Sequence, residues 1–199
     1  MKIAQVCHRY YPEIGGVEQH VQNISERLAI ANEVTVLTTD PTGNLPVNEN
    51  VNNVKILRFK SWAPKGAYYI SNELNNYLKM NLKDFDIVHA HNYHSLPALY
   101  AAKAKDVHKL IFTPHYHGTG STFFRKILHL PYRYLGKTIF KKANKVVVKF
   151  PKGEIREFKA QQVRKLYNQD QERNSLKDYY AKAYGDDAFA QALTQRRGR

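Results

Sequence analysis

Short apolar runs alternate with amphipathic segments over the first 150 residues, and this alternation leaves few folds open to the chain. Strands are predicted where the runs occur, at Lys2–Cys7, Val34–Thr38, Val54–Phe59, Ile87–Ala90, Leu110–Thr113 and Lys145–Lys149. Helices are predicted between them, at Val17–Leu28, Ser71–Leu82, Pro97–Lys105 and Phe123–Lys142, and a polar loop at Asp40–Asn53. Strands spaced by helices predict the α/β class, with a parallel sheet covered by helices on both faces.

The composition changes at about Pro151. Residues 151–199 have few β-branched side chains, many Lys, Gln, Asp and Tyr, and no run that resembles a strand. We therefore divide the chain into a domain over 1–150 and a tail over 151–199. The tail is predicted to be mainly helical and frayed at its end.

Hydropathy and cysteine content exclude several classes of protein. No stretch approaches the roughly 18 apolar residues of a transmembrane helix, and the N-terminus lacks the apolar run of a signal peptide. The single cysteine, Cys7, cannot form an internal disulfide, and its place in a predicted strand indicates a small buried residue. These features predict a protein of the reducing cytoplasm.

The chain is strongly basic, with 31 Lys and Arg, 17 Asp and Glu, and a formal net charge of +14. Residues 1–150 alone carry 20 basic and 10 acidic side chains, so the charge is not confined to the tail. Such a balance favours anionic partners, namely phosphorylated small molecules, an anionic membrane surface or nucleic acid. No RNA-binding signature accompanies it, which makes nucleic acid the weakest of the three.

Glycine and histidine residues follow the predicted strands, where parallel sheets bind their ligands. Gly15 and Gly16 follow the first strand and open a helix, so backbone N–H groups there would stabilise a phosphate or a sugar hydroxyl. The pattern is neither GxGxxG nor a P-loop. The alternative is that the two glycines only form a tight turn.

Several histidines lie at or after the fourth and fifth strands: His89, His91, His94, His115 and His117. Alternation along the strand places His89 and His91 on one face. An HxH pair with a third histidine can bind zinc, so one alternative is a metal hydrolase that uses His89, His91 and His115. No carboxylate accompanies them, so we expect no metal, and polar residues at strand ends are the simpler interpretation. A neutral imidazole, of which His115 is the best candidate, can instead stabilise charge as a bond to an anomeric carbon breaks.

The predicted helix Phe123–Lys142 alternates basic with aromatic and aliphatic side chains. This pattern is typical of a helix that lies on anionic lipid, and the candidate membrane-facing residues are Arg125, Lys126, Arg133 and Lys137. A helix that packs on the core and exposes a basic face explains the pattern equally well.

Five segments, in this order, resemble the N-terminal domain of family-four glycosyltransferases, which are retaining enzymes of the GT-B fold. They are KIAQVCHRYYPEIGGVEQHVQNISERLA, EVTVLTTD, FDIVHAHNYHSLPAL, TPHYHGTG and KKANKVVVK. The resemblance implies a Rossmann-like domain over 1–150 that faces a second, donor-binding domain across a cleft. It also implies transfer of a sugar from a nucleotide diphosphate sugar to a hydroxyl acceptor, such as a glycan or a lipid-linked sugar, without a metal.

The resemblance further implies roles for single residues. His115 would approach the transferred sugar as the catalytic residue, and Gly15 and Gly16 would approach the donor's phosphates and sugar. The acceptor would contact loops after the first, fourth and fifth strands, at Glu13, His91, Asn92, His94 and His117.

The resemblance stops after the sixth predicted strand. The family's Asn-Gly segment and the donor domain's Glu-seven-residues-Glu motif are missing from 151–199, which is too short for a second Rossmann-like domain. We therefore expect weak activity from this chain alone, with a partner chain supplying the donor domain. The alternative is a non-catalytic module that binds an acceptor or the inner face of the membrane.

Overall fold

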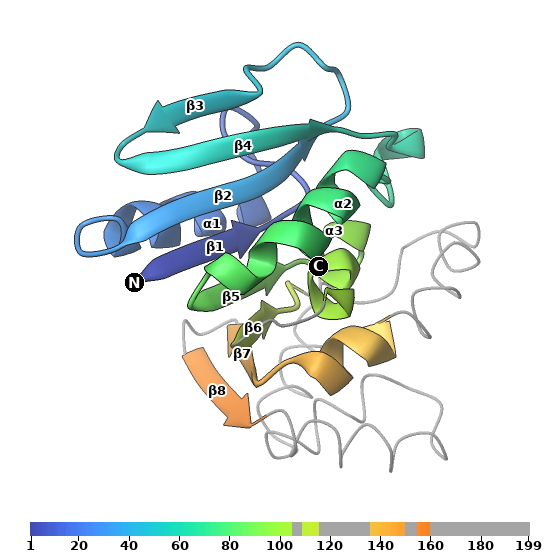
Figure 1. Ribbon diagram of the computed structural model, residues 1–199. Coiled ribbons are helices and arrows are strands. Elements are labelled where there is room, and N and C mark those ends of the chain that lie inside the picture. The colour runs from blue at the N-terminus through green and yellow to red at the C-terminus, as the bar shows by residue number, and fades with distance from the viewer. Residues whose placement is uncertain (105–108, 116–135, 150–154, 160–199) are drawn as a thin grey trace, which may run out of the picture.

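The computed structural model describes residues 1–104, 109–115, 136–149 and 155–159. Their strands form one eight-stranded sheet in the order β3-β4-β2-β1-β5-β6-β7-β8 (Figure 1). The strands are β1 Lys2–Val6, β2 Glu33–Asp40, β3 Asn48–Val51, β4 Val54–Lys60, β5 Ile87–His91, β6 Leu110–Thr113, β7 Lys145–Lys149 and β8 Ile155–Lys159. All six predicted strands are confirmed, with ends shifted by at most two residues.

The six inner strands are parallel, and β1 lies at their centre. Ile3 of β1 pairs with Val34 of β2 on one side and with Ile87 of β5 on the other. The chain therefore builds outward from β1 in both directions, first through β2 and β4 and then through β5, β6 and β7. The strand order reverses between β1 and β5, and in open α/β sheets a crevice for ligands opens at such a point.

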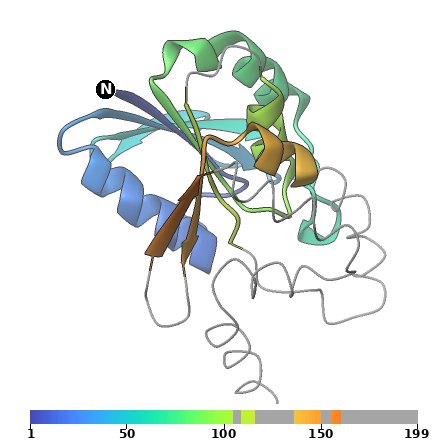
Figure 2. The same cartoon turned by 90° about the horizontal axis from the view of Figure 1, so that it is seen from below.

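Helices cover both faces of this sheet, as the alternating pattern predicts. Helix α1 (Gly16–Leu28) lies on one face, while α2 (Asn72–Asn81), α3 (Leu96–Lys103) and a helical segment over 136–142 lie on the other (Figure 2). Two short 3-10 turns, Pro64–Gly66 and Leu82–Asp84, flank α2. This two-sided cover confirms the predicted α/β class, with a Rossmann-like parallel sheet.

The core is divided between the two faces by the alternation along each strand. Ile3 and Cys7 pack with Val21 of α1, whereas Ala4 and Val6 pack with the α2 and α3 side. Cys7 is fully buried as predicted, and burial raises the pKa of its thiol to about 12. Burial of both sheet faces explains why the inner strands read as nearly continuous apolar runs.

Two strands lie where the sequence predicts none. β3 lies inside the predicted polar loop Asp40–Asn53 and pairs antiparallel with β4. Asn52 and Asn53 join the two strands with positive φ angles of 52° and 64°, which suits a tight hairpin turn. The side chains of β3 alternate between exposed and half-buried, so this edge strand has no apolar run to reveal it.

β8 is the second correction, because Ile155–Lys159 pairs antiparallel with β7 in a segment predicted to have no strand. The sheet thus continues past residue 150. The remainder of the predicted helical tail, 160–199, lies outside the described residues, as do most of the predicted helix Phe123–Lys142 and its candidates Arg125, Lys126 and Arg133. Among the described residues, no helix has the length and apolarity needed to cross a bilayer.

Candidate functional site

The loops after β1, β5 and β6 meet at the carboxyl edge of the sheet, beside the point where the strand order reverses. His8 follows β1, Asn92 follows β5 and His115 follows β6. Helix α1, which begins one residue after Gly15, extends from the same edge. His8 and His115, 107 positions apart in the sequence, are thereby gathered around one location.

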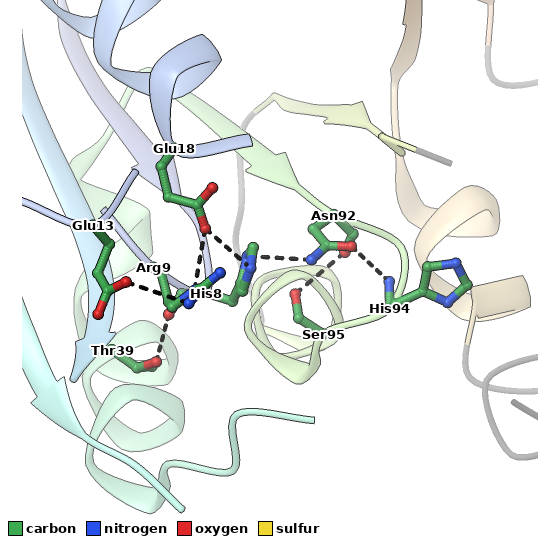
Figure 3. A network of polar contacts seen from close by, with 8 residues as sticks. All are labelled: His8, Arg9, Glu13, Glu18, Thr39, Asn92, His94 and Ser95. Carbon is green, nitrogen blue, oxygen red and sulfur yellow. Dashed lines mark hydrogen bonds and ion pairs between the residues drawn. The ribbon is translucent and has the colours of Figure 1, made fainter. Parts of the chain in front are cut away.

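A network of hydrogen bonds fixes the protonation of His8 (Figure 3). The His94 backbone N–H donates to Asn92 Oδ1 over 3.0 Å, which leaves the Asn92 amide nitrogen to donate to His8 Nδ1 over 3.2 Å. Burial and the nearby Arg9 lower the pKa of His8 to about 3, so its ring is neutral. The proton is therefore on Nε2, which faces Glu18 Oε1 at 3.4 Å.

Glu18 is buried in the first turn of α1 and connects His8 with Arg9. Arg9 Nε lies 3.2 Å from Glu18 Oε1, and Arg9 Nη1 lies 3.3 Å from the carboxylate of Glu13 on the exposed loop. The Glu18 carboxylate also complements the partial positive charge at the start of α1. This end of the helix is thus already matched by an acidic side chain, and Arg9 supplies the compensating cation.

Gly15 is needed for the close approach of Glu18 rather than for an unusual backbone conformation. Its φ is −167°, which any residue adopts, but a Cβ at this position would overlap the Glu18 carboxylate. A Cβ on Gly16 would meet no atom within 4 Å. The two glycines therefore differ, because only the first has a steric requirement inside this domain.

A second group of side chains, the histidine cluster, consists of His20, His91 and His115 on the α1 face of the sheet. His91 is fully buried; its Nε2 lies 2.7 Å from Gln5 Oε1 and its Nδ1 lies 3.2 Å from His115 Nε2. Burial is the main reason that the pKa of His91 lies well below its usual value. His20 of α1 contacts the His115 ring edge-on, with centroids 4.8 Å apart.

His115 has a strained backbone. Its φ of 46° lies in the left-handed region that non-glycine residues rarely adopt, and Asn92 in the neighbouring loop has a φ of 70°. Two such residues side by side at the carboxyl edge of adjacent strands are typical of a ligand site, where the surrounding structure holds a conformation that the residue alone would avoid.

Five of the predicted site residues belong to one of two groups in the structure. Glu13, Gly15 and Asn92 belong to the network around Glu18 and His8, while His91 and His115 contact each other in the histidine cluster. His91 is predicted to contact the acceptor, but in the structure its side chain is completely buried.

The other predicted site residues lie outside these two groups. His94 contributes its backbone N–H, and its ring points away from His8 (Figure 3). That ring packs edge-on against Tyr93. His117 lies outside the described residues, and Lys137 is half-buried in the helical segment over 136–142.

Sequence reasoning missed the residues that organise the site from within. These are Gln5, His8, Arg9, Glu18 and His20. Of these residues, only Gln5 gives a signal in the sequence. It is a polar residue in an otherwise apolar strand, and a buried polar side chain there needs a hydrogen-bond partner. His8, seven positions before Gly15, and Glu18, two positions after Gly16, carry no pattern that separates them from ordinary loop and helix residues.

A solved structure of comparable fold is sucrose-phosphate synthase from Thermosynechococcus elongatus, with 17% identity and a TM-score of 0.54 over 75% of this chain. This chain spans 42% of that chain. A second structure of the same synthase matches 76% of this chain and 78% of that chain at 17% identity, with a TM-score of 0.48. No curated protein matches the chain.

The model of Glycosyltransferase Family 4 matches residues 14–149, which is more than half of the chain. The matched range includes the glycine pair, α1, Asn92 and the histidine cluster. This protein therefore belongs to glycosyltransferase family 4.

Proposed function

We propose that the domain takes part in retaining transfer of a sugar from a nucleotide diphosphate sugar to a hydroxyl acceptor, without a metal. The observation that carries this proposal is the meeting of Asn92 and His115, both at positive φ, with the start of α1 at the carboxyl edge of the sheet. Such an edge is where α/β sheets bind nucleotides and sugars.

His115 is the proposed catalytic residue. Its imidazole is half-buried and contacts His91 and His20 of the histidine cluster. Since His115 Nε2 faces His91, its Nδ1 would accept a hydrogen bond from a hydroxyl of the transferred sugar and stabilise the charge that develops as the glycosidic bond to phosphate breaks. His91, being buried against His115, is proposed as a positioning residue for that ring.

The remaining site residues are proposed to bind the two substrates. Exposed Gly16 at the start of α1 and the adjacent Gly15 would approach the donor's phosphates and sugar. Glu13, Asn92, His94 and His117 would contact the acceptor, with Glu13 presented by its ion pair to Arg9. A glycan or a lipid-linked sugar offers the hydroxyl groups that such polar side chains recognise.

We further propose that the chain needs a donor-binding domain from elsewhere for full activity. A retaining GT-B site lies between two Rossmann-like domains, and this chain spans 42% of the sucrose-phosphate synthase chain that it resembles in fold. A partner chain is the proposed source. Alone, the domain would supply the acceptor side and turn over slowly.

The net charge favours one alternative, a non-catalytic module that binds an acceptor or an anionic membrane. The chain carries a charge of +14, and Arg125, Lys126, Arg133 and Lys137 are spaced along one basic and aromatic segment. Under this alternative the protein would be a peripheral protein of the cytoplasmic membrane face.

The test is a transfer assay with the purified chain, a panel of labelled nucleotide sugars, and glycan or lipid-linked acceptors. We expect slow formation of a product with the donor's anomeric configuration, and His115→Ala should lower its rate about 100-fold. Lys79→Ala, on the exposed face of α2, is the matched control and should leave the rate unchanged.

Four results would change the proposal. An inverted product, or an unaltered rate for His115→Ala, would contradict the proposed mechanism. Fast turnover by the chain alone would contradict the need for a partner. Absence of transfer with every donor, together with measurable binding of an acceptor, would favour the non-catalytic module.

A further inference from the structure

Three imidazoles from three separate elements converge below the carboxyl edge of the sheet. His20 comes from α1, His91 from the end of β5 and His115 from the segment after β6. One ring nitrogen of each lies within 4.8 Å of the others. Since α1 and β5 are fixed by the core, this convergence is a property of the tertiary structure and not of a local sequence motif.

Gln5 sets the tautomer of the buried member. Its Oε1 lies 2.7 Å from His91 Nε2, which therefore donates its N–H to Gln5 and leaves the lone pair on Nδ1. Histidines that bind metals show this arrangement, in which one nitrogen binds the ion and the other donates to a fixed acceptor. His91 is thus oriented with its basic nitrogen directed at His115.

The separation between His91 and His115 fits a shared ion. Two nitrogens bound to one tetrahedral zinc at about 2.0–2.1 Å are about 3.3 Å apart. His91 Nδ1 and His115 Nε2 are 3.2 Å apart and share a proton in this structure. A metal between them would replace that proton, and His115 would carry its hydrogen on Nδ1 instead.

The third nitrogen needs only a small adjustment. His20 is half-buried, and its ring lies edge-on to both partners, with centroid distances of 4.8 Å to His115 and 5.9 Å to His91. Closing the largest nitrogen separation from 4.8 Å to a tetrahedral edge requires a shift of about 1.5 Å. Rotation of the His20 and His115 side chains, both half-buried, would have to supply this shift, because His91 is fully buried.

We infer that His20, His91 and His115 form a binding site for a divalent transition metal of the zinc class, with Gln5 orienting His91. Three neutral imidazoles suit Zn²⁺ or Co²⁺ and not Mg²⁺ or Ca²⁺, which prefer oxygen ligands. Three protein ligands leave a fourth position for water or another ligand.

The metal site goes beyond the proposed glycosyl transfer and does not rest on it. Family-level transfer requires no metal in our proposal, and an ion here would occupy Nε2 of His115, the proposed catalytic ring. Metal binding would thus oppose transfer, as an inhibitory site. Binding can be measured with no sugar donor present, so the two proposals fail independently.

The experiment is titration of the full chain, stripped with a chelator, with ZnCl₂ by calorimetry and with CoCl₂ by visible absorption. We expect one equivalent of either ion with a tetrahedral Co²⁺ spectrum, and no binding of MgCl₂. His20→Gln and Gln5→Leu should each weaken binding about 10- to 100-fold. Gln5→Glu retains the acceptor for His91 and should restore binding relative to Gln5→Leu.

His94→Gln is the matched control, because its ring packs on Tyr93 outside the cluster and its loss should leave the affinity unchanged. Far-ultraviolet circular dichroism verifies folding of each variant, and His115→Gln replaces any variant that fails to fold. The inference is overturned if no equivalent of Zn²⁺ binds. It is equally overturned if folded His20→Gln binds as the wild type does, or if His94→Gln weakens binding as much.

Discussion

Glu18 illustrates how one buried acidic residue can organise a site at the scale of single side chains. It lies 3.4 Å from His8 Nε2 and 3.2 Å from Arg9 Nε, and it occupies the space that a side chain on Gly15 would need. Taking such a carboxylate out of water is costly unless cations and hydrogen-bond donors surround it. Arg9 and His8 lie within ion-pair distance of this carboxylate, and the partial positive charge at the start of α1 adds to their effect.

Gly15→Ala should destabilise the fold by about 1–3 kcal/mol, because the added methyl group displaces the Glu18 carboxylate from His8 and Arg9. Gly16→Ala is the matched control: it meets no atom within 4 Å and should be neutral or slightly stabilising. Urea unfolding of both variants measures the difference. Equal effects from the two substitutions would contradict the steric role of Gly15.

At the scale of elements, a side-chain cap marks where α2 begins. α2 begins after Ser71, whose Oγ accepts from the Leu74 backbone N–H over 3.2 Å and donates to the Lys60 carbonyl over 2.7 Å. The hydroxyl therefore joins the end of β4 to the start of α2. Ser95 precedes α3 in the same way, but its side chain caps no N–H.

Ser71→Ala should lower the free energy of unfolding by about 1 kcal/mol, since it removes an N-cap together with the bond to Lys60. Ser95→Ala should cost less, because Ser95 loses only a 3.3 Å bond to the Asn92 carbonyl. Thermal unfolding followed by circular dichroism compares the two. A larger loss for Ser95→Ala would show that the cap at Ser71 is not the stabilising feature.

At the scale of the whole molecule, the question is whether the basic segment over 123–142 binds an anionic membrane. We expect the chain to sediment with anionic vesicles, and the four changes Arg125→Glu, Lys126→Glu, Arg133→Glu and Lys137→Glu together to abolish sedimentation. A set with the same charge change, at Lys55, Lys60, Lys79 and Lys83, controls for net charge.

The two sets of variants distinguish a specific membrane face from general attraction. Loss of sedimentation in the first set with retention in the second supports a membrane-facing segment over 123–142. Equal loss in both sets would mean that vesicles respond only to total charge. No sedimentation of the wild-type chain with phosphatidylserine vesicles would remove the membrane-binding alternative.

The sequence by itself determined those strands and helices whose buried residues form a regular apolar pattern. Inner strands such as Val34–Thr38 are covered on both faces, so their apolar runs are nearly continuous, and α2 repeats leucines on one side. Alternation also placed His89 and His91 on the same face, where their ring centroids are 4.0 Å apart. The glycine pair and His115 were found because they follow predicted strands.

Only the tertiary structure decided what those residues touch. Antiparallel pairing with β4 and β7 defines the edge strands β3 and β8, and neither segment contains a run of apolar residues that would predict a strand. The contacts Gln5–His91, His8–Asn92 and His20–His115 join residues 84 to 95 positions apart, and no local pattern encodes such pairs. These contacts arise because β1 and β5 pair side by side and α1 packs on one face of them. Only the packing of the whole chain produces this arrangement.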